Sequence, residues 1–133
     1  GLEDAMKKAL RDSVLEPFDI DYVNAHAPST PIGDASELCA IKKVFPEPQS
    51  ISFSSTKALT GHGLSLSSIM EAGFCCLALK DGFLPGSANV EEPDDAIGHL
   101  DLLRETIDRQ AEHVLSNSSG FGGANVSLVF GRT

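Results

Sequence analysis

The chain has 133 residues, of which 41% are hydrophobic and 22% charged, as is typical of a single globular domain. Its net charge of −9 argues against a nucleic-acid-binding surface, because phosphate binding needs clustered lysine and arginine. Nowhere do about 18 apolar residues follow one another, so the sequence predicts no membrane-spanning helix.

The three cysteines, Cys39, Cys75 and Cys76, are odd in number and two of them are adjacent. This pattern indicates free thiols in a reducing compartment, and we expect a cytoplasmic protein. No cysteine or histidine spacing resembles a zinc site, so no metal is expected.

The first elements are a helix and a strand. Residues 2–14 place apolar side chains at the 3.6-residue period of an amphipathic helix. Residues 20–26 (IDYVNAH) then form a β-rich strand that ends in polar residues.

A second helix and a second strand follow. Asp34 is the expected N-cap, with Glu37 completing a capping box, and Pro46 and Pro48 end the helix near Phe45. Residues 50–55 (SISFSS) predict the next strand.

Residues 64–79 are apolar nearly all the way round and rich in small side chains, which predicts a central helix buried on several faces. A turn at 80–82 and an acidic loop lead to a short strand near 100–104. Strands at 112–118 and 124–131 flank a glycine-rich segment and form a hairpin. This order predicts an α/β fold in which a mixed five-stranded sheet is layered with helices.

Two segments invite a functional interpretation because they follow strands. His26 stands at a strand end, where reactive groups gather in α/β sheets, although a structural or merely exposed histidine is an alternative. His62 lies before the helix at 64–79, whose N-terminal partial charge disfavours an imidazolium. A neutral His62 can donate a hydrogen bond to a developing oxyanion, whereas the alternative is a polar loop in which Thr60 caps the helix.

Two further places carry weaker signals. Glu71 is costly inside so apolar a helix unless it is paired, and Lys57 is the obvious partner for a structural or catalytic ion pair. The loop Gly120–Gly123 can present backbone N–H groups to an oxyanion, but a tight hairpin needs the same glycines.

Together and in this order, these motifs resemble the C-terminal half of β-ketoacyl-[acyl-carrier-protein] synthases, which have a thiolase-like fold. The resemblance covers essentially all of residues 1–133 and is carried by three stretches: DYVNAHAPSTPIGDASELCAIKKVF (21–45), SSTKALTGHGLSLSSIMEA (54–72) and NSSGFGGANVSLVF (117–130).

The resemblance implies decarboxylative Claisen condensation of malonyl-carrier protein with an acyl thioester, in fatty-acid or polyketide synthesis. It implies that His26 and His62 support decarboxylation and that Lys57 is paired with Glu71. The backbone N–H of Phe121 would help to form the oxyanion hole and its ring would gate the acyl pocket. Thr30 would hold the pantetheine arm. No cofactor is implied beyond the phosphopantetheine on the carrier protein.

The sequence departs from the family motifs at several positions. Pro28 replaces a threonine, and Ser65–Ser68 (SLSS) replace Gly-Ala-Ala-Gly. Ser119 replaces a phenylalanine and Ala124 a threonine. These changes indicate a divergent member with its own substrate preference.

The resemblance also implies that the nucleophilic cysteine belongs to an absent N-terminal half, so we expect the fragment alone to be inactive. The expected partners are that half, an acyl carrier protein and a second copy of the full-length protein. One alternative is a non-catalytic, chain-length-factor-like subunit of a ketosynthase heterodimer. The others are a relative that only decarboxylates or transfers acyl groups, and a stand-alone binding domain.

Overall fold

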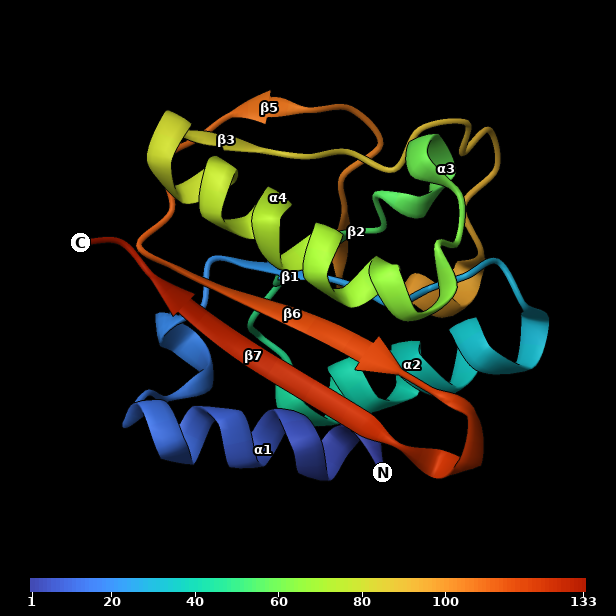
Figure 1. Ribbon diagram of the computed structural model, residues 1–133, viewed down its shortest axis with the longest axis horizontal. Helices are drawn as coiled ribbons and strands as arrows, with labels where there is room; N and C mark the ends of the chain where they lie inside the picture. The colour runs from blue at the N-terminus through green and yellow to red at the C-terminus, as the bar shows by residue number, and fades with distance from the viewer.

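The computed structural model describes all 133 residues and is built around one five-stranded sheet (Figure 1). The strand order is β4-β2-β1-β6-β7, in which β7 pairs antiparallel with β6 and all other neighbours are parallel. The strands are β1 (Tyr22–Asn24), β2 (Ser52–Ser54), β4 (Asp101–Leu102), β6 (His113–Ser119) and β7 (Asn125–Gly131). The predicted mixed sheet and the terminal hairpin are confirmed.

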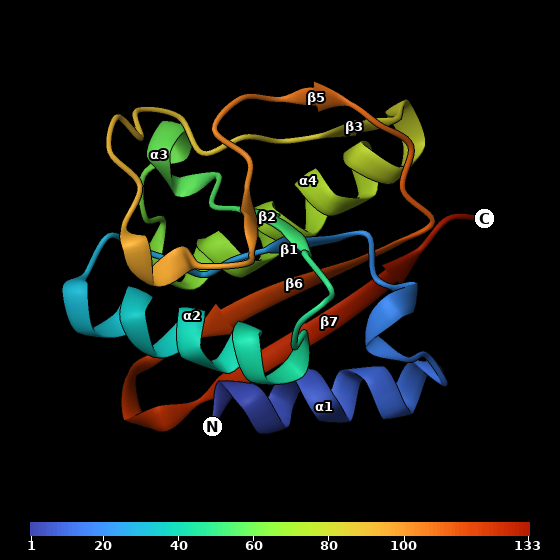
Figure 2. The same cartoon turned by 180° about the vertical axis from the view of Figure 1, so that it is seen from behind.

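Helices cover both faces of the sheet (Figures 1 and 2). α1 (Leu2–Ser13) and α2 (Pro31–Val44) lie on one face, and α4 (Ser67–Asp81) lies on the other. Successive strand side chains point to opposite faces, so Val23 joins the core under α1 and α2, whereas Tyr22 joins the core under α4.

The remaining elements are short, and the sequence predicted none of them except residues 64–66, which begin the predicted helix at 64–79 as a 3-10 turn. They are α3 (Lys57–Thr60), the antiparallel pair β3 (Phe83–Leu84) and β5 (Ile107–Asp108), and four 3-10 turns: η1 (Pro17–Asp19), η2 (Leu64–Leu66), η3 (Asp95–Ile97) and η4 (Phe121–Gly123). Two-residue strands are too short to show a hydrophobic period.

The start of α2 corrects the predicted cap. The helix begins at Pro31 with Thr30 as N-cap, because proline suits the first helical position. Asp34 therefore lies within the first turn, where its Oδ1 accepts the Thr30 backbone N–H at 3.1 Å. Glu37 does not complete a capping box but points into the interior.

α4 is buried along one stripe only. Glu71, Cys75 and Leu79 face the sheet, whereas Ile69 and Leu77 are 66% and 46% exposed. The predicted burial on several faces is therefore realised on one face of α4 within this chain. None of the helices is both long enough and apolar enough to cross a membrane.

Candidate active site

The candidate site forms at the edge of the sheet where β1 and β2 end. The two strands are parallel, with Asn24 opposite Ser54, so the segments that follow them leave from the same edge. His26 follows β1, and Lys57 begins α3 shortly after β2. The parallel pairing of β1 and β2 therefore brings the segments that contain His26 and Lys57 to the same edge of the sheet.

The two histidines of the predicted site meet. The ring centroids of His26 and His62 are 5.4 Å apart, and the ring planes are inclined at 83°, an edge-to-face contact. Both side chains also line the same cavity.

The hydrogen bonds of His62 fix its tautomer. The backbone N–H of Leu64 donates to His62 Nδ1 at 3.2 Å, and Ser67 Oγ lies 2.9 Å from the same nitrogen. Because an amide N–H can only donate, Nδ1 is an acceptor and the proton of the neutral ring is on Nε2. The Nε2–H is then available as a donor.

Thr60, the last residue of α3, donates to the carbonyls of Thr56 and Gly61 instead of capping α4.

His26 is kept neutral by its surroundings. Burial lowers its pKa to about 4, with a further contribution from the positive charge of Lys57. Its Nδ1 is buried and has no hydrogen-bond partner within the chain. At neutral pH, His26 is therefore an uncharged imidazole.

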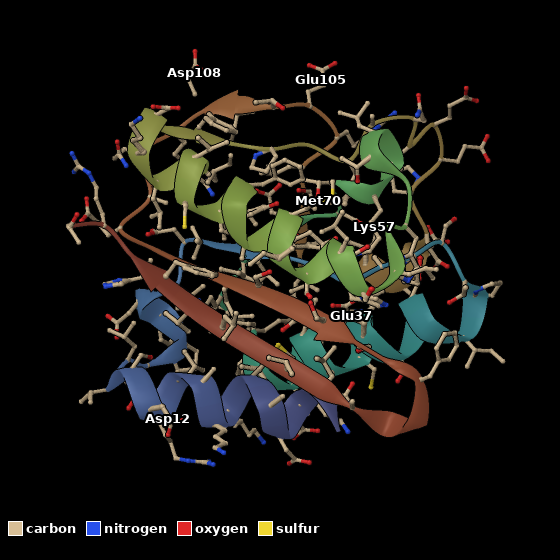
Figure 3. All side chains as sticks on the ribbon, viewed as in Figure 1. Asp12, Glu37, Lys57, Met70, Glu105 and Asp108 are labelled. Carbon is tan, nitrogen blue, oxygen red and sulfur yellow. The ribbon has the colours of Figure 1, made fainter.

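Lys57 and Glu71 form a buried ion pair. Lys57 Nζ donates to Glu71 Oε1, and the two side chains are 5% and 3% exposed (Figure 3 labels Lys57). Burial raises the pKa of Glu71, and the Lys57 ammonium opposes that rise. The partner that the sequence predicted for Glu71 is confirmed.

Glu37 is a site residue that sequence reasoning missed (Figure 3). Its carboxylate accepts the backbone N–H of His26 at 2.9 Å and that of Ala27 at 2.7 Å, and it also accepts Asn117 Nδ2 at 3.2 Å. Burial raises its pKa, and these donors oppose the rise. The available signal was helical spacing, because Glu37 shares the buried stripe of Ile41 and Val44.

Thr30 and Phe121 lie around the histidines. Together with His26 and His62 they line a cavity of about 680 Å³ between the N-terminal end of α4 and the β6–β7 hairpin. The Phe121 side chain is fully exposed at the tip of that hairpin. The predicted site residues His26, His62, Thr30 and Phe121 thus share one cavity, and Lys57 and Glu71 lie buried beside it.

None of the three cysteines lines this cavity. Cys39 and Cys76 are exposed on α2 and α4, and all three thiols are free. Burial raises the pKa of Cys75 to about 12, so its thiol is inert at neutral pH. No group of three or more histidine, cysteine, aspartate or glutamate side chains is arranged to hold a metal ion.

Comparison with known proteins gives one consistent result. Residues 1–91 match the family described as the β-ketoacyl synthase C-terminal domain. The chain is 47% identical over 110 residues to the 3-oxoacyl-[acyl-carrier-protein] synthase 1 of Escherichia coli strain K12, covering 83% of this chain and 27% of that protein.

Solved structures agree. A β-ketoacyl synthase from Burkholderia phymatum superposes with a TM-score of 0.93 at 38% identity, covering 99% of this chain and 32% of that one. A type II polyketide ketosynthase, solved with its acyl-carrier protein (AntDE:AntF), superposes with a TM-score of 0.94 at 28% identity, covering 100% and 33%. The chain thus spans about a third of the length of these relatives or less.

Proposed function

Because the chain belongs to the β-ketoacyl synthase family, we propose that residues 1–133 are the C-terminal domain of an enzyme that condenses malonyl-carrier protein with an acyl thioester. The observation that carries this proposal is the edge contact of His26 and His62, 5.4 Å between ring centroids, beside the buried pair of Lys57 and Glu71.

The chemistry needs neutral donors. When malonyl thioester loses carbon dioxide, the electrons of the broken C–C bond move toward the thioester oxygen, which becomes negative. Uncharged N–H groups held in place at that oxygen stabilise the charge as it develops. His62 offers its Nε2–H. His26, with a pKa of about 4, is uncharged at pH 7. The carbanion then attacks the acyl carbonyl, and the thiolate that carried the acyl group leaves.

Lys57 and Glu71 are buried beside the histidine cavity and affect the site through the charge of Lys57. The Lys57 ammonium contributes to the low pKa of His26, and Glu71 holds that ammonium in place. We assign the Phe121 backbone N–H to the oxyanion hole and its ring to a gate. The hydroxyl of Thr30 is assigned to the pantetheine arm, in keeping with their place on the histidine cavity.

The nucleophile is assigned to the part of the parent protein that this chain does not contain. Cys39, Cys75 and Cys76 all lie outside the histidine cavity, and Cys75 is inert. We predict that the isolated chain gives no condensation product from acyl- and malonyl-carrier protein. Product above background would contradict this assignment.

The proposed partners are an acyl carrier protein, the N-terminal half of the enzyme and a second copy of the full-length protein. A carrier protein is present in the AntDE:AntF complex, which supports the first. The free thiols favour a reducing compartment, so we place the protein in the cytoplasm. The pathway is fatty-acid or polyketide synthesis, in line with the named relatives.

Intact-mass spectrometry of the full-length parent, after incubation with an acyl-carrier protein, tests the proposal. We expect one added acyl group on an upstream cysteine, followed by release of carbon dioxide from malonyl-carrier protein. His62→Ala should retain acyl uptake and lower decarboxylation by about 100-fold or more. Carrier binding without acyl uptake would instead favour the non-catalytic, chain-length-factor-like subunit.

A further inference from the structure

Ser67, the first residue of α4, contacts the imidazole ring of His62. Its Oγ lies 2.9 Å from His62 Nδ1, and the backbone nitrogen of Leu64 lies 3.2 Å from the same atom. Because the Leu64 amide can only donate, Nδ1 is an acceptor and the Ser67 hydroxyl must also be a donor. His62 Nδ1 therefore accepts two hydrogen bonds, of which the one from Ser67 is the shorter.

The fold fixes the Ser67 hydroxyl in this position. Ser67 is 6% exposed, and its backbone N–H donates to the carbonyl of Leu64 at the end of η2. Within the chain, His62 Nδ1 is the hydrogen-bond partner of its hydroxyl. A buried hydroxyl without a partner is destabilising, so the folded protein favours keeping this bond. Alanine, which the family motif has at this position, could not make it.

The His62 ring depends on such contacts for a defined orientation. The last torsion angle of a histidine side chain has broad energy minima, so neighbouring groups decide where the ring nitrogens point. His62 is exposed within this chain and lies in the segment between α3 and η2. Leu64 is only two residues away in the same segment, whereas Ser67 belongs to the regular helix α4. The bond from Ser67 thus connects the ring to a regular element of the fold.

A donor at Nδ1 also affects the opposite side of the ring. Hydrogen bonds in a chain polarise one another, so a hydroxyl that donates to Nδ1 makes the Nε2–H of His62 a stronger donor. In the proposed reaction, that N–H binds the thioester oxygen on which negative charge develops. Ser67 can therefore influence the reaction without contacting the substrate.

We propose that Ser67 is a positioning residue for decarboxylation, whose hydroxyl orients the His62 ring and directs its Nε2–H at the thioester oxygen. The inference rests on the proposed condensing function. Because one hydrogen bond between neutral groups is lost, Ser67→Ala should lower the kcat of decarboxylation about fivefold and leave KM unchanged. Acyl uptake by the upstream cysteine should be unaffected.

The test measures carbon dioxide released from malonyl-carrier protein by the full-length parent and its variants. Ser67→Thr keeps a hydroxyl, whereas Ser67→Val has the same shape without one, so this pair separates the hydrogen bond from packing. We expect Ser67→Thr to retain the kcat of the parent and Ser67→Val to lower it about fivefold, as Ser67→Ala does. Ser36→Ala, at an exposed residue of α2, should leave kcat unchanged.

A second readout is the nitrogen NMR signal of His62 Nδ1 in the parent labelled with isotopic histidine. Loss of a donor moves the signal of an acceptor ring nitrogen to lower field. We expect this shift in Ser67→Ala and Ser67→Val but not in Ser67→Thr. His62→Ala, which lacks the signal, identifies it.

Equal kcat values for Ser67→Thr and Ser67→Val, or an effect on KM alone, would overturn the inference and leave the proposed function intact. An unshifted Nδ1 signal in Ser67→Val would overturn it as well. If the unmodified parent releases no carbon dioxide from malonyl-carrier protein, the condensing function itself fails and the inference fails with it.

Discussion

His26 combines three constraints at one residue: its ring contacts His62, its backbone N–H is held by Glu37, and its Nδ1 is buried without a partner. Burial and the Lys57 ammonium both penalise its protonated form. The lowered pKa of His26 therefore affects the free energy of unfolding as well as the chemistry of the site.

Acid should destabilise the parent protein through His26. Its pKa is about 4 in the folded state against an ordinary value of 6.5, so the unfolded state binds more protons between these values. Its contribution to stability is present above about pH 6.5 and is lost as the pH falls toward 4. Urea unfolding at pH 7.5 and pH 4.5 should show a smaller loss in His26→Gln than in the unmodified protein. Equal losses in the two proteins would contradict this assignment.

Breaking the Lys57–Glu71 pair should be costly. In Glu71→Ala the Lys57 ammonium is left buried without its partner, and we expect the parent to lose about 3–5 kcal/mol of unfolding free energy. Denaturant midpoints measure this loss. Glu112→Gln breaks the exposed contact with Arg132, 3.3 Å between Nη1 and Oε1, and should leave the midpoint unchanged. Replacing both partners, as in Lys57→Met/Glu71→Leu, should recover part of the loss.

At the scale of single elements, the C-terminus of α1 carries backbone strain. Val14 caps the helix in the left-handed conformation, with φ 57° and ψ 40°, which is unfavourable for a β-branched residue. Its side chain is 90% exposed, so little packing compensates.

Val14→Gly should therefore stabilise the parent by about 1 kcal/mol, because glycine adopts this cap conformation without strain. Thermal unfolding should show a higher midpoint. Ser13→Gly, inside the last turn of α1, is the matched control and should lower the midpoint because glycine weakens a helix. A lower midpoint for Val14→Gly would show that the strain is compensated elsewhere.

The sequence predicted the longer elements well and the site in part. Helical period and flanking prolines located α1 and α2, and the paired motifs located His26, His62 and the partner of Glu71. Glu37 was misassigned because a carboxylate early in a helix is equally compatible with a cap, and only the fold places it against the His26 backbone. The pair β3–β5 is made by two contacts across the chain and leaves no local pattern.

At the scale of the whole molecule, apolar side chains remain uncovered. They lie on α4, on the turn before it and on β7, with exposures between 46% and 69%: Leu64, Leu66, Ile69, Leu77, Val126 and Leu128. Single exposed apolar residues are common, but this number around one helix and one strand indicates a surface that associates with protein.

We expect the isolated chain to self-associate through this surface, and light scattering should report a mass above that of one chain. Ile69→Lys/Leu77→Lys should shift the protein toward the monomer, whereas Phe18→Lys, at an exposed residue in η1, should not. A stable monomer at high concentration would favour the stand-alone binding domain.

The hydrogen bond from Asn117 to Glu37 spans 80 residues, and it joins β6 to the carboxylate that holds the His26 backbone. During synthesis on the ribosome, α2 and the His26 segment emerge well before β6. The hydrogen bond of Glu37 to Asn117 therefore cannot form until β6 is available. The same holds for the pairing of β1 with Val114–Ser116. Contacts this distant along the chain are slow to form. The contacts around His26 are consequently completed only after β6 has left the ribosome. A chain arrested earlier contains both histidines but lacks the Asn117–Glu37 hydrogen bond and the β1–β6 pairing.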